Sequence, residues 1–101
     1  MQMSEIIVYV NDEYLPIKNA TVSFRDGGFQ FGDGLFETIR FQNRKLFSAE
    51  KHLHRLRNAL KILELPLDKS NDELISILQN LIRKNDIDTG LLRLMITRGE
   101  I

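Results

Sequence analysis

Hydrophobic residues alternate with polar ones, or stand in short β-branched and aromatic runs, along most of the first half of the chain. This pattern predicts β-strands, and the short polar segments between them predict turns. Pro16 lies in the second predicted strand and indicates a sheet edge, because proline has no backbone N–H to donate to a neighbouring strand. The predicted strands cover residues 6–10, 14–17, 20–24, 35–42 and 45–47.

From Ser48 onward, the hydrophobic residues recur at helical spacing. Ser48 is a suitable N-cap for a first helix that runs to Glu64 and that Pro66 stops. Residues 70–73 form a capping-box sequence that opens a second helix, and residues 91–97 have the composition of a mostly buried strand. Strands followed by two helices and a further strand predict an α+β fold, an antiparallel sheet covered by two helices.

Composition narrows the possible functions. The chain has 101 residues, 43% hydrophobic and 28% charged, which suits one globular domain. Fourteen Lys and Arg balance fourteen Asp and Glu, which argues against nucleic acid or an anionic membrane as a partner. The lack of cysteine excludes disulfides, thiolate metal sites and cysteine nucleophiles, and His52 and His54 alone make a poor metal site.

Two features of the sequence bear on the cellular compartment of the protein. No apolar run is long enough to span a bilayer, and the first five residues lack the basic segment and apolar stretch of a secretory signal. A cytoplasmic, reducing compartment is therefore the expectation.

A glycine-rich loop at residues 26–34 holds four of the six glycines, with Phe29, Phe31 and Phe36 in or beside it. Such glycine density lets the backbone approach a ligand closely. The loop is not a nucleotide P-loop, because no lysine and hydroxyl follow Gly32, and it lacks the third glycine of a dinucleotide fingerprint. Spacing alone favours a tight turn before a strand, whereas the phenylalanines suit the rim of a pocket.

The first predicted helix carries one cation at the border of its apolar face. At about 100° per residue, His52 falls inside the apolar arc and Arg55 lies about 40° beyond its edge. A histidine in this place is more often a hydrogen-bonded border residue than a ligand. Arg55 either extends into solvent or presents its planar guanidinium to an anion, and its position on the helix leaves both open.

Side-chain alternation brings further cations to candidate pocket walls. In the strand at 35–42 a cation shares one face with an aromatic ring and a hydroxyl, whereas Glu37 falls on the opposite face. Arg93 interrupts an apolar run, and burying it would require a carboxylate or a bound anion. For Arg40 the alternative interpretation is a cross-strand ion pair, and for Arg98 it is an exposed residue at the end of a strand. The residues concerned are Phe36, Thr38, Arg40, Arg93 and Arg98.

Three segments of the chain resemble a known family in order and spacing. They are residues 31–40 (FGDGLFETIR), 52–56 (HLHRL) and 92–99 (LRLMITRG). Together they are similar to the N-terminal domain of the class IV, or fold-type IV, pyridoxal-phosphate enzymes. This family includes branched-chain aminotransferases, D-amino acid aminotransferases and aminodeoxychorismate lyases. The likeness covers nearly all of the chain.

The resemblance implies a role for each candidate residue. Arg55 would hold the phosphate of pyridoxal 5′-phosphate, and Arg98 would stand where the D-amino acid enzymes bind the substrate carboxylate. Phe31 stands where many relatives carry a tyrosine, so a hydroxyl contact from this position is missing. The other pocket residues that the resemblance implies are Phe36, Thr38, Arg40 and Arg93.

The resemblance also implies a second domain, a class of substrates and an oligomeric state for the complete enzyme. In this family the lysine that forms the Schiff base belongs to a second domain, so residues 1–101 are expected to be the N-terminal domain, with no catalytic residue and no metal. The substrates would be amino acids and 2-oxo acids, and the complete enzyme a homodimer. An amino acid aminotransferase is the first interpretation. An aminodeoxychorismate lyase, a truncated non-catalytic binding domain and a general site for phosphorylated metabolites are the alternatives.

Overall fold

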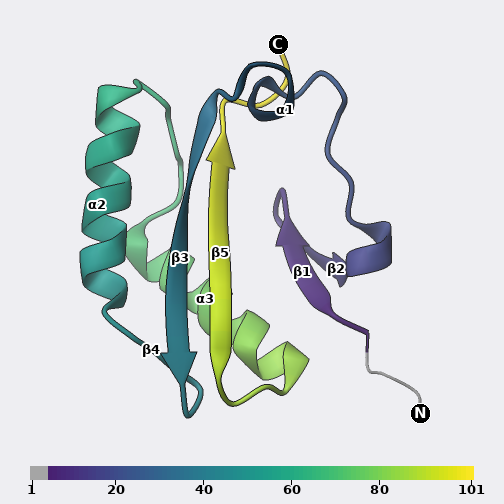
Figure 1. Cartoon of the computed structure of the whole chain (residues 1–101), viewed down its shortest axis with the longest axis vertical. Coiled ribbons are helices and arrows are strands. Elements are labelled where there is room, and N and C mark those ends of the chain that lie inside the picture. The colour runs from purple at the N-terminus through teal and green to yellow at the C-terminus, as the bar shows by residue number, and fades with distance from the viewer. Residues whose placement is uncertain (1–4) are drawn as a thin grey trace.

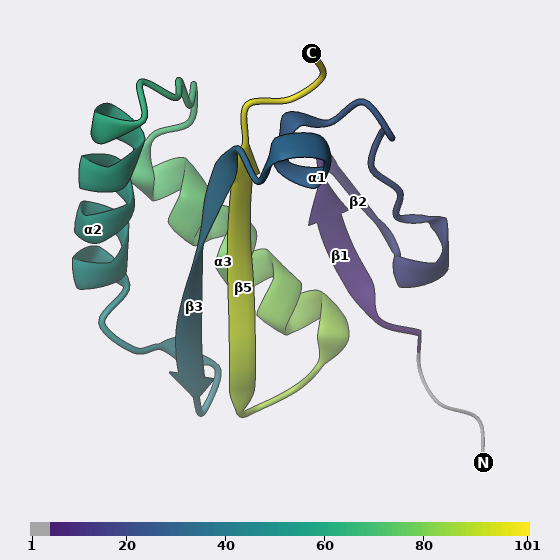
Figure 2. The same cartoon turned by 45° about the horizontal axis from the view of Figure 1, so that its top comes forward.

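A computed structural model describes residues 5–101, which form two antiparallel sheets, two long helices and two short helical turns (Figures 1 and 2). Residues 1–5, from which the absence of a secretory signal was predicted, lie largely outside the described residues. In chain order the elements are β1 (Ile7–Val10), β2 (Glu13–Pro16), η1 (Ile17–Asn19), α1 (Gly27–Phe31), β3 (Gly34–Gln42), β4 (Lys45–Leu46), α2 (Ala49–Ile62), α3 (Asn71–Asn85) and β5 (Gly90–Thr97).

The larger sheet has the strand order β4-β3-β5, with β3 in the centre. An antiparallel ladder from the pair Gly34–Thr97 to the pair Phe41–Gly90 joins β3 to β5. It brings the residues after the glycine-rich loop beside the last strand of the chain. Along both strands, buried or half-buried residues alternate with exposed ones, as the sequence predicts for a sheet with one covered face.

Helices α2 and α3 cover one face of this sheet. Figures 1 and 2 show α3 crossing behind β3 and β5, with α2 along the outer side of β3. No helix within residues 5–101 covers the other face, where Phe36, Leu91 and Met95 are exposed. The predicted α+β fold with two helices on an antiparallel sheet is therefore confirmed. The buried apolar residues are Ile39, Phe41, Leu53, Leu56, Leu60, Leu65, Leu74, Leu78 and Ile82.

The first hairpin differs from the prediction because it does not join the larger sheet. Strands β1 and β2 pair only with each other, and the hairpin packs on α3 instead. Asn85 at the end of α3 holds the hairpin through both polar atoms of its side-chain amide. Its Oδ1 accepts from Ile7 N at 2.8 Å, and its Nδ2 donates to Ile7 O at 3.0 Å. The strand predicted at 20–24 is wrong. This segment is irregular, and Val22 and Phe24 are exposed.

The loop at 26–34 holds a helical turn, α1, where the sequence favoured a simple tight turn. Asp26 caps α1 by accepting a hydrogen bond from Gly28 N at 2.8 Å, and Gly32 ends it in a left-handed conformation. The loop also packs closely on β5. A Cβ atom on Gly34 would lie 2.5 Å from the carbonyl oxygen of Ile96, so the contact requires glycine there.

The two long helices begin in different ways. Ser70 and Glu73 form the predicted capping box of α3, each accepting a hydrogen bond of 3.1 Å from the other's backbone N–H. Ser48 precedes α2 as predicted, but its side chain makes no capping bond and its backbone is left-handed, with φ at 55°. Helix α2 ends at Ile62, two residues before the predicted end, and Leu63 and Glu64 form a turn.

Candidate functional site

A buried carboxylate on β3 binds the arginine that the helix was predicted to place at its border. Glu37 is only 7% exposed and lies on the face of β3 that the helices cover. Its Oε1 accepts a hydrogen bond from Arg55 Nε at 2.7 Å, and its Oε2 accepts one from Arg55 Nη2 at 2.8 Å. His52, one helical turn before Arg55, places Nδ1 2.9 Å from the same Oε2. Both oxygens of Glu37 are therefore paired.

Arg55 is anchored on one side and open on the other. Its hydrogen bonds within residues 5–101 all go to Glu37, through Nε and Nη2, while its side chain is 70% exposed. A guanidinium has two edges that can bind a pair of oxygens, and Glu37 occupies the one between Nε and Nη2. No hydrogen bond within residues 5–101 uses Nη1, so the edge between Nη1 and Nη2 is open to solvent.

The pair shifts the pKa of both partners. The hydrogen bonds from Arg55 hold the pKa of Glu37 at about 2, helped by His52 and opposed by burial of the carboxylate. The carboxylate in turn raises the pKa of Arg55. Glu37 therefore carries a full negative charge at neutral pH although it is buried.

Four of the predicted pocket residues lie together on the open face of the sheet. Thr38 pairs with Arg93 in the ladder, and the carbon Cζ of Arg93 lies 4.7 Å from the centre of the Phe36 ring. On the same face, Cζ of Arg40 lies 5.0 Å from the centre of the Phe47 ring. Arg93 is exposed, so it needs no carboxylate partner, and an aromatic ring supports each cation instead.

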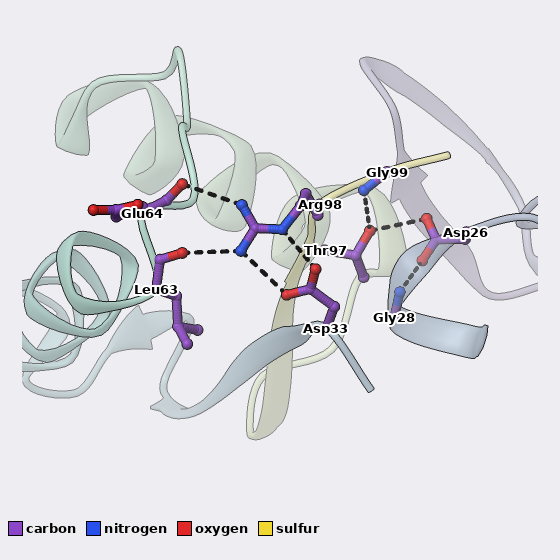
Figure 3. Close-up of polar contacts among 8 residues, drawn as sticks. All are labelled: Asp26, Gly28, Asp33, Leu63, Glu64, Thr97, Arg98 and Gly99. Carbon is purple, nitrogen blue, oxygen red and sulfur yellow. Dashed lines mark hydrogen bonds and ion pairs between the residues drawn. The ribbon is translucent and has the colours of Figure 1, made fainter. Parts of the chain in front are cut away.

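Arg98 joins three segments of the chain (Figure 3). Its Nε donates to Asp33 Oδ2 at 2.5 Å, and its Nη2 reaches Asp33 Oδ1 at 3.2 Å. The guanidinium also donates to the carbonyl oxygens of Leu63, at 2.9 Å, and Glu64, at 3.2 Å. These carbonyls follow the last turn of α2, where backbone acceptors have no partner within the helix. The role that the resemblance implies for Arg98 towards a substrate stays a prediction.

A second polar cluster docks the glycine-rich loop on the end of β5 (Figure 3). Thr97 Oγ1 donates to Asp26 Oδ2 at 2.8 Å and accepts from Gly99 N at 3.2 Å. The other oxygen of Asp26 accepts from Gly28 N. Asp26 and Thr97 were not predicted to be partners, since nothing in their local sequence pattern marks them as such.

The candidate residues do not all converge on one point. Phe36 and Thr38 face away from the helices while Glu37 between them faces towards the helices, because successive side chains of a strand point to opposite faces. Arg55 therefore lies on the helix side of β3. Phe31 is exposed on α1. Glu37 was not among the residues predicted to form the site, although a carboxylate among the apolar residues of its strand face was a visible signal.

Metal-binding clusters and membrane-spanning helices are both absent from residues 5–101. No group of three or more His, Asp or Glu side chains there is arranged to hold a metal ion. No helix in that range has the length and apolar character needed to cross a membrane.

Comparison with known proteins identifies the family. The family model described as amino-transferase class IV matches residues 34–100, which include β3, both long helices and β5. The chain belongs to the class IV aminotransferase family. A D-alanine aminotransferase of Listeria monocytogenes is 38% identical to it over 92 residues, covering 91% of this chain and 32% of that protein. The chain thus spans about a third of the length of such curated relatives.

Solved structures of the class IV family have the same fold. The branched-chain amino acid aminotransferase from Escherichia coli superposes with a TM-score of 0.88 at 27% identity, over 97% of this chain and 35% of that one. The 4-amino-4-deoxychorismate lyase from Pseudomonas aeruginosa superposes with a TM-score of 0.68 at 36% identity, over 81% of this chain and 29% of that one. The resemblance to fold-type IV enzymes in the sequence is thereby confirmed.

Glu37 should make the stability of the protein depend on pH in the acid range. Its pKa of about 2 lies below the ordinary value of 4.5, so the pair stabilises the fold fully above pH 4.5 and loses this contribution as the pH falls towards 2. Glu37→Leu has no carboxyl group to titrate and should lose less stability across this window. Urea denaturation at a series of pH values tests this, and equal losses in both proteins would contradict it.

The contact between Arg98 and Asp33 should contribute to stability. Arg98→Ala is expected to lower the free energy of unfolding, since it removes a charge-assisted pair and two bonds to carbonyls. In a double-mutant cycle with Asp33→Asn, the two losses should not add. Arg93→Ala is the matched control, because the Arg93 side chain lies over the Phe36 ring and makes no hydrogen bond or ion pair within the described residues, and its loss should cost less. Additive losses at positions 33 and 98 would count against the pairing.

Proposed function

We propose that this chain is the N-terminal domain of a pyridoxal-phosphate-dependent amino acid aminotransferase of class IV. In this role it binds the phosphate of the cofactor through Arg55 and forms one wall of the substrate pocket. The observation that carries the proposal is the guanidinium of Arg55, anchored by Glu37 on one edge and with Nη1 on the other edge unbonded within residues 5–101. The complete enzyme would be a homodimer, with its Schiff-base lysine in a second domain.

The chemistry of Arg55 fits a phosphate ester. A phosphate accepts two hydrogen bonds from one edge of a guanidinium, and such charge-assisted bonds are stronger than neutral ones. The edge between Nη1 and Nη2 has this geometry, and the exposure of the side chain lets a ligand reach it. When bound, pyridoxal phosphate would supply the electron-withdrawing ring for chemistry at the α-carbon of an amino acid. This chain would hold the cofactor's charged end in place.

The open face of the sheet suits an amino acid or a 2-oxo acid. Both substrate classes carry a carboxylate, with which Arg40 or Arg93 can pair, and Phe36 gives an apolar surface beside them. Thr38, opposite Arg93 in the ladder, adds a hydroxyl group. Phe31 adds a ring without a hydroxyl. Arg98 already binds a carboxylate, that of Asp33.

An aminodeoxychorismate lyase is the second candidate, because the Pseudomonas aeruginosa lyase is 36% identical over the part it shares with this chain. Both enzymes would use the same phosphate contact and would differ in what happens to the substrate. The complete protein should therefore be assayed for glutamate formation from amino donors and 2-oxoglutarate, and for pyruvate release from aminodeoxychorismate. We expect glutamate formation. Pyruvate release alone would establish the lyase, and activity in neither assay would contradict both candidates.

Arg55→Ala in the complete protein should weaken the binding of pyridoxal phosphate by about 10- to 100-fold, as expected when one charge-assisted contact is lost. The cofactor-free protein should also lose some thermal stability, because the buried Glu37 carboxylate then keeps only His52 as a partner, but the loss of cofactor affinity should be far larger. Absorbance of the cofactor retained after dialysis measures the first effect, and calorimetry measures the second.

Arg57→Ala is the matched control for Arg55→Ala, since Arg57 lies on the same helix but binds Asn71 and the carbonyl of Lys69. It should leave cofactor binding unchanged. Equal losses of cofactor in the two variants would contradict the proposed role of Arg55.

A further inference from the structure

Glu37 interrupts a strand face that is otherwise apolar. Its neighbours on this face are Leu35, Ile39 and Phe41, and the last two are buried. A buried ion pair can often be replaced by hydrophobic residues with no loss of stability. The fold alone therefore does not call for a carboxylate at this position, and its purpose must be sought in what it binds.

The contacts of Glu37 restrict Arg55 to one orientation. Two parallel hydrogen bonds of 2.7 and 2.8 Å fix the plane of the guanidinium, which a single bond would leave free to rotate. His52 Nδ1, at 2.9 Å, fixes the carboxylate in turn. The carboxylate is held by the sheet, and both of its partners, Arg55 and His52, belong to α2, so the arrangement rests on regular secondary structure.

An exposed arginine without such an anchor would lose much of its freedom on binding a ligand. Arginine has a long side chain with many rotamers, and ordering them opposes binding. In Arg55 the side-chain conformation is already restricted by the bonds from Nε and Nη2 to Glu37, although the side chain is 70% exposed. The edge between Nη1 and Nη2 is thereby held in a constant direction.

We propose that Glu37 is a positioning residue for Arg55: its carboxylate holds one edge of the guanidinium so that the other edge is presented, already ordered, to a phosphate ester. This inference rests on the proposed function of Arg55. The inference adds that Glu37 raises the affinity for the phosphate ester through Arg55, without a contact of its own to the ester.

One physical effect opposes this role. The negative charge of Glu37 repels a phosphate and partly cancels the charge of Arg55. The repulsion is weakened because Arg55 stands between them in contact with solvent, where charges interact over a high effective dielectric constant. If ordering outweighs repulsion, removing the carboxylate weakens phosphate binding; if repulsion outweighs ordering, removing it strengthens binding.

The decisive variant is Glu37→Leu in the complete protein, which continues the apolar pattern of the strand face. Dissociation constants are measured by absorbance for pyridoxal phosphate and for pyridoxal, which lacks the phosphate. We expect binding of pyridoxal phosphate to weaken about tenfold, as the loss of an ordered arginine predicts, with pyridoxal binding unchanged. The cofactor-free variant should unfold at a temperature close to that of the original protein. Glu37→Gln, which offers one carbonyl acceptor, should act in the same direction.

Further variants separate this inference from the function on which it rests. Adding Glu37→Leu to Arg55→Ala should cause no further loss of phosphate affinity, because the group that Glu37 positions is gone. If Arg55→Ala lowers phosphate affinity and Glu37→Leu leaves it unchanged or raises it, Glu37 does not position Arg55. Equal weakening for both ligands, or the failure of both position-37 variants to fold, would also overturn the inference. If Arg55→Ala itself has no effect, the proposed function of Arg55 fails.

Discussion

The antiparallel ladder between β3 and β5 determines where most candidate residues lie, and the remaining elements are arranged around it. It runs without interruption from Gly34–Thr97 to Phe41–Gly90 and joins segments that are far apart in the chain. Because strand side chains alternate between faces, this one pairing separates the helix-covered residues from the open ones. It also brings Asp33, just before β3, beside Arg98, just after β5.

The two faces of the sheet hold their charges in different ways. On the covered face a carboxylate is buried, and the Arg55 guanidinium and the His52 ring satisfy both of its oxygens. On the open face, Arg40 and Arg93 lie over aromatic rings and have no need of a carboxylate partner. A cation over a ring keeps its hydrogen-bond donors for a ligand. Both faces thus combine a fixed cation with access from solvent.

The end of the sheet near the glycine-rich loop is built for rigidity. Asp26 and Thr97 fasten the loop to β5, and Arg98 connects Asp33 with the turn after α2 (Figure 3). The close approach at Gly34 leaves no room for a side chain. These contacts keep α1, with Phe31, in a constant place relative to the strands that carry Phe36 and Arg40.

The sequence by itself determined the features that depend on neighbouring residues. Helical spacing located α2 and α3, the capping box at Ser70 marked the start of α3, and alternation correctly sorted the faces of β3 and β5. The motifs around Arg55 and Arg98 identified the family. Only the tertiary structure decided that Glu37 binds Arg55, that Arg98 binds Asp33, that the first hairpin packs on α3 and that residues 20–24 form no strand. The first three depend on partners many residues away, and a strand at 20–24 would have needed a distant partner as well; local pattern carries no information about which distant groups a fold brings within hydrogen-bond distance.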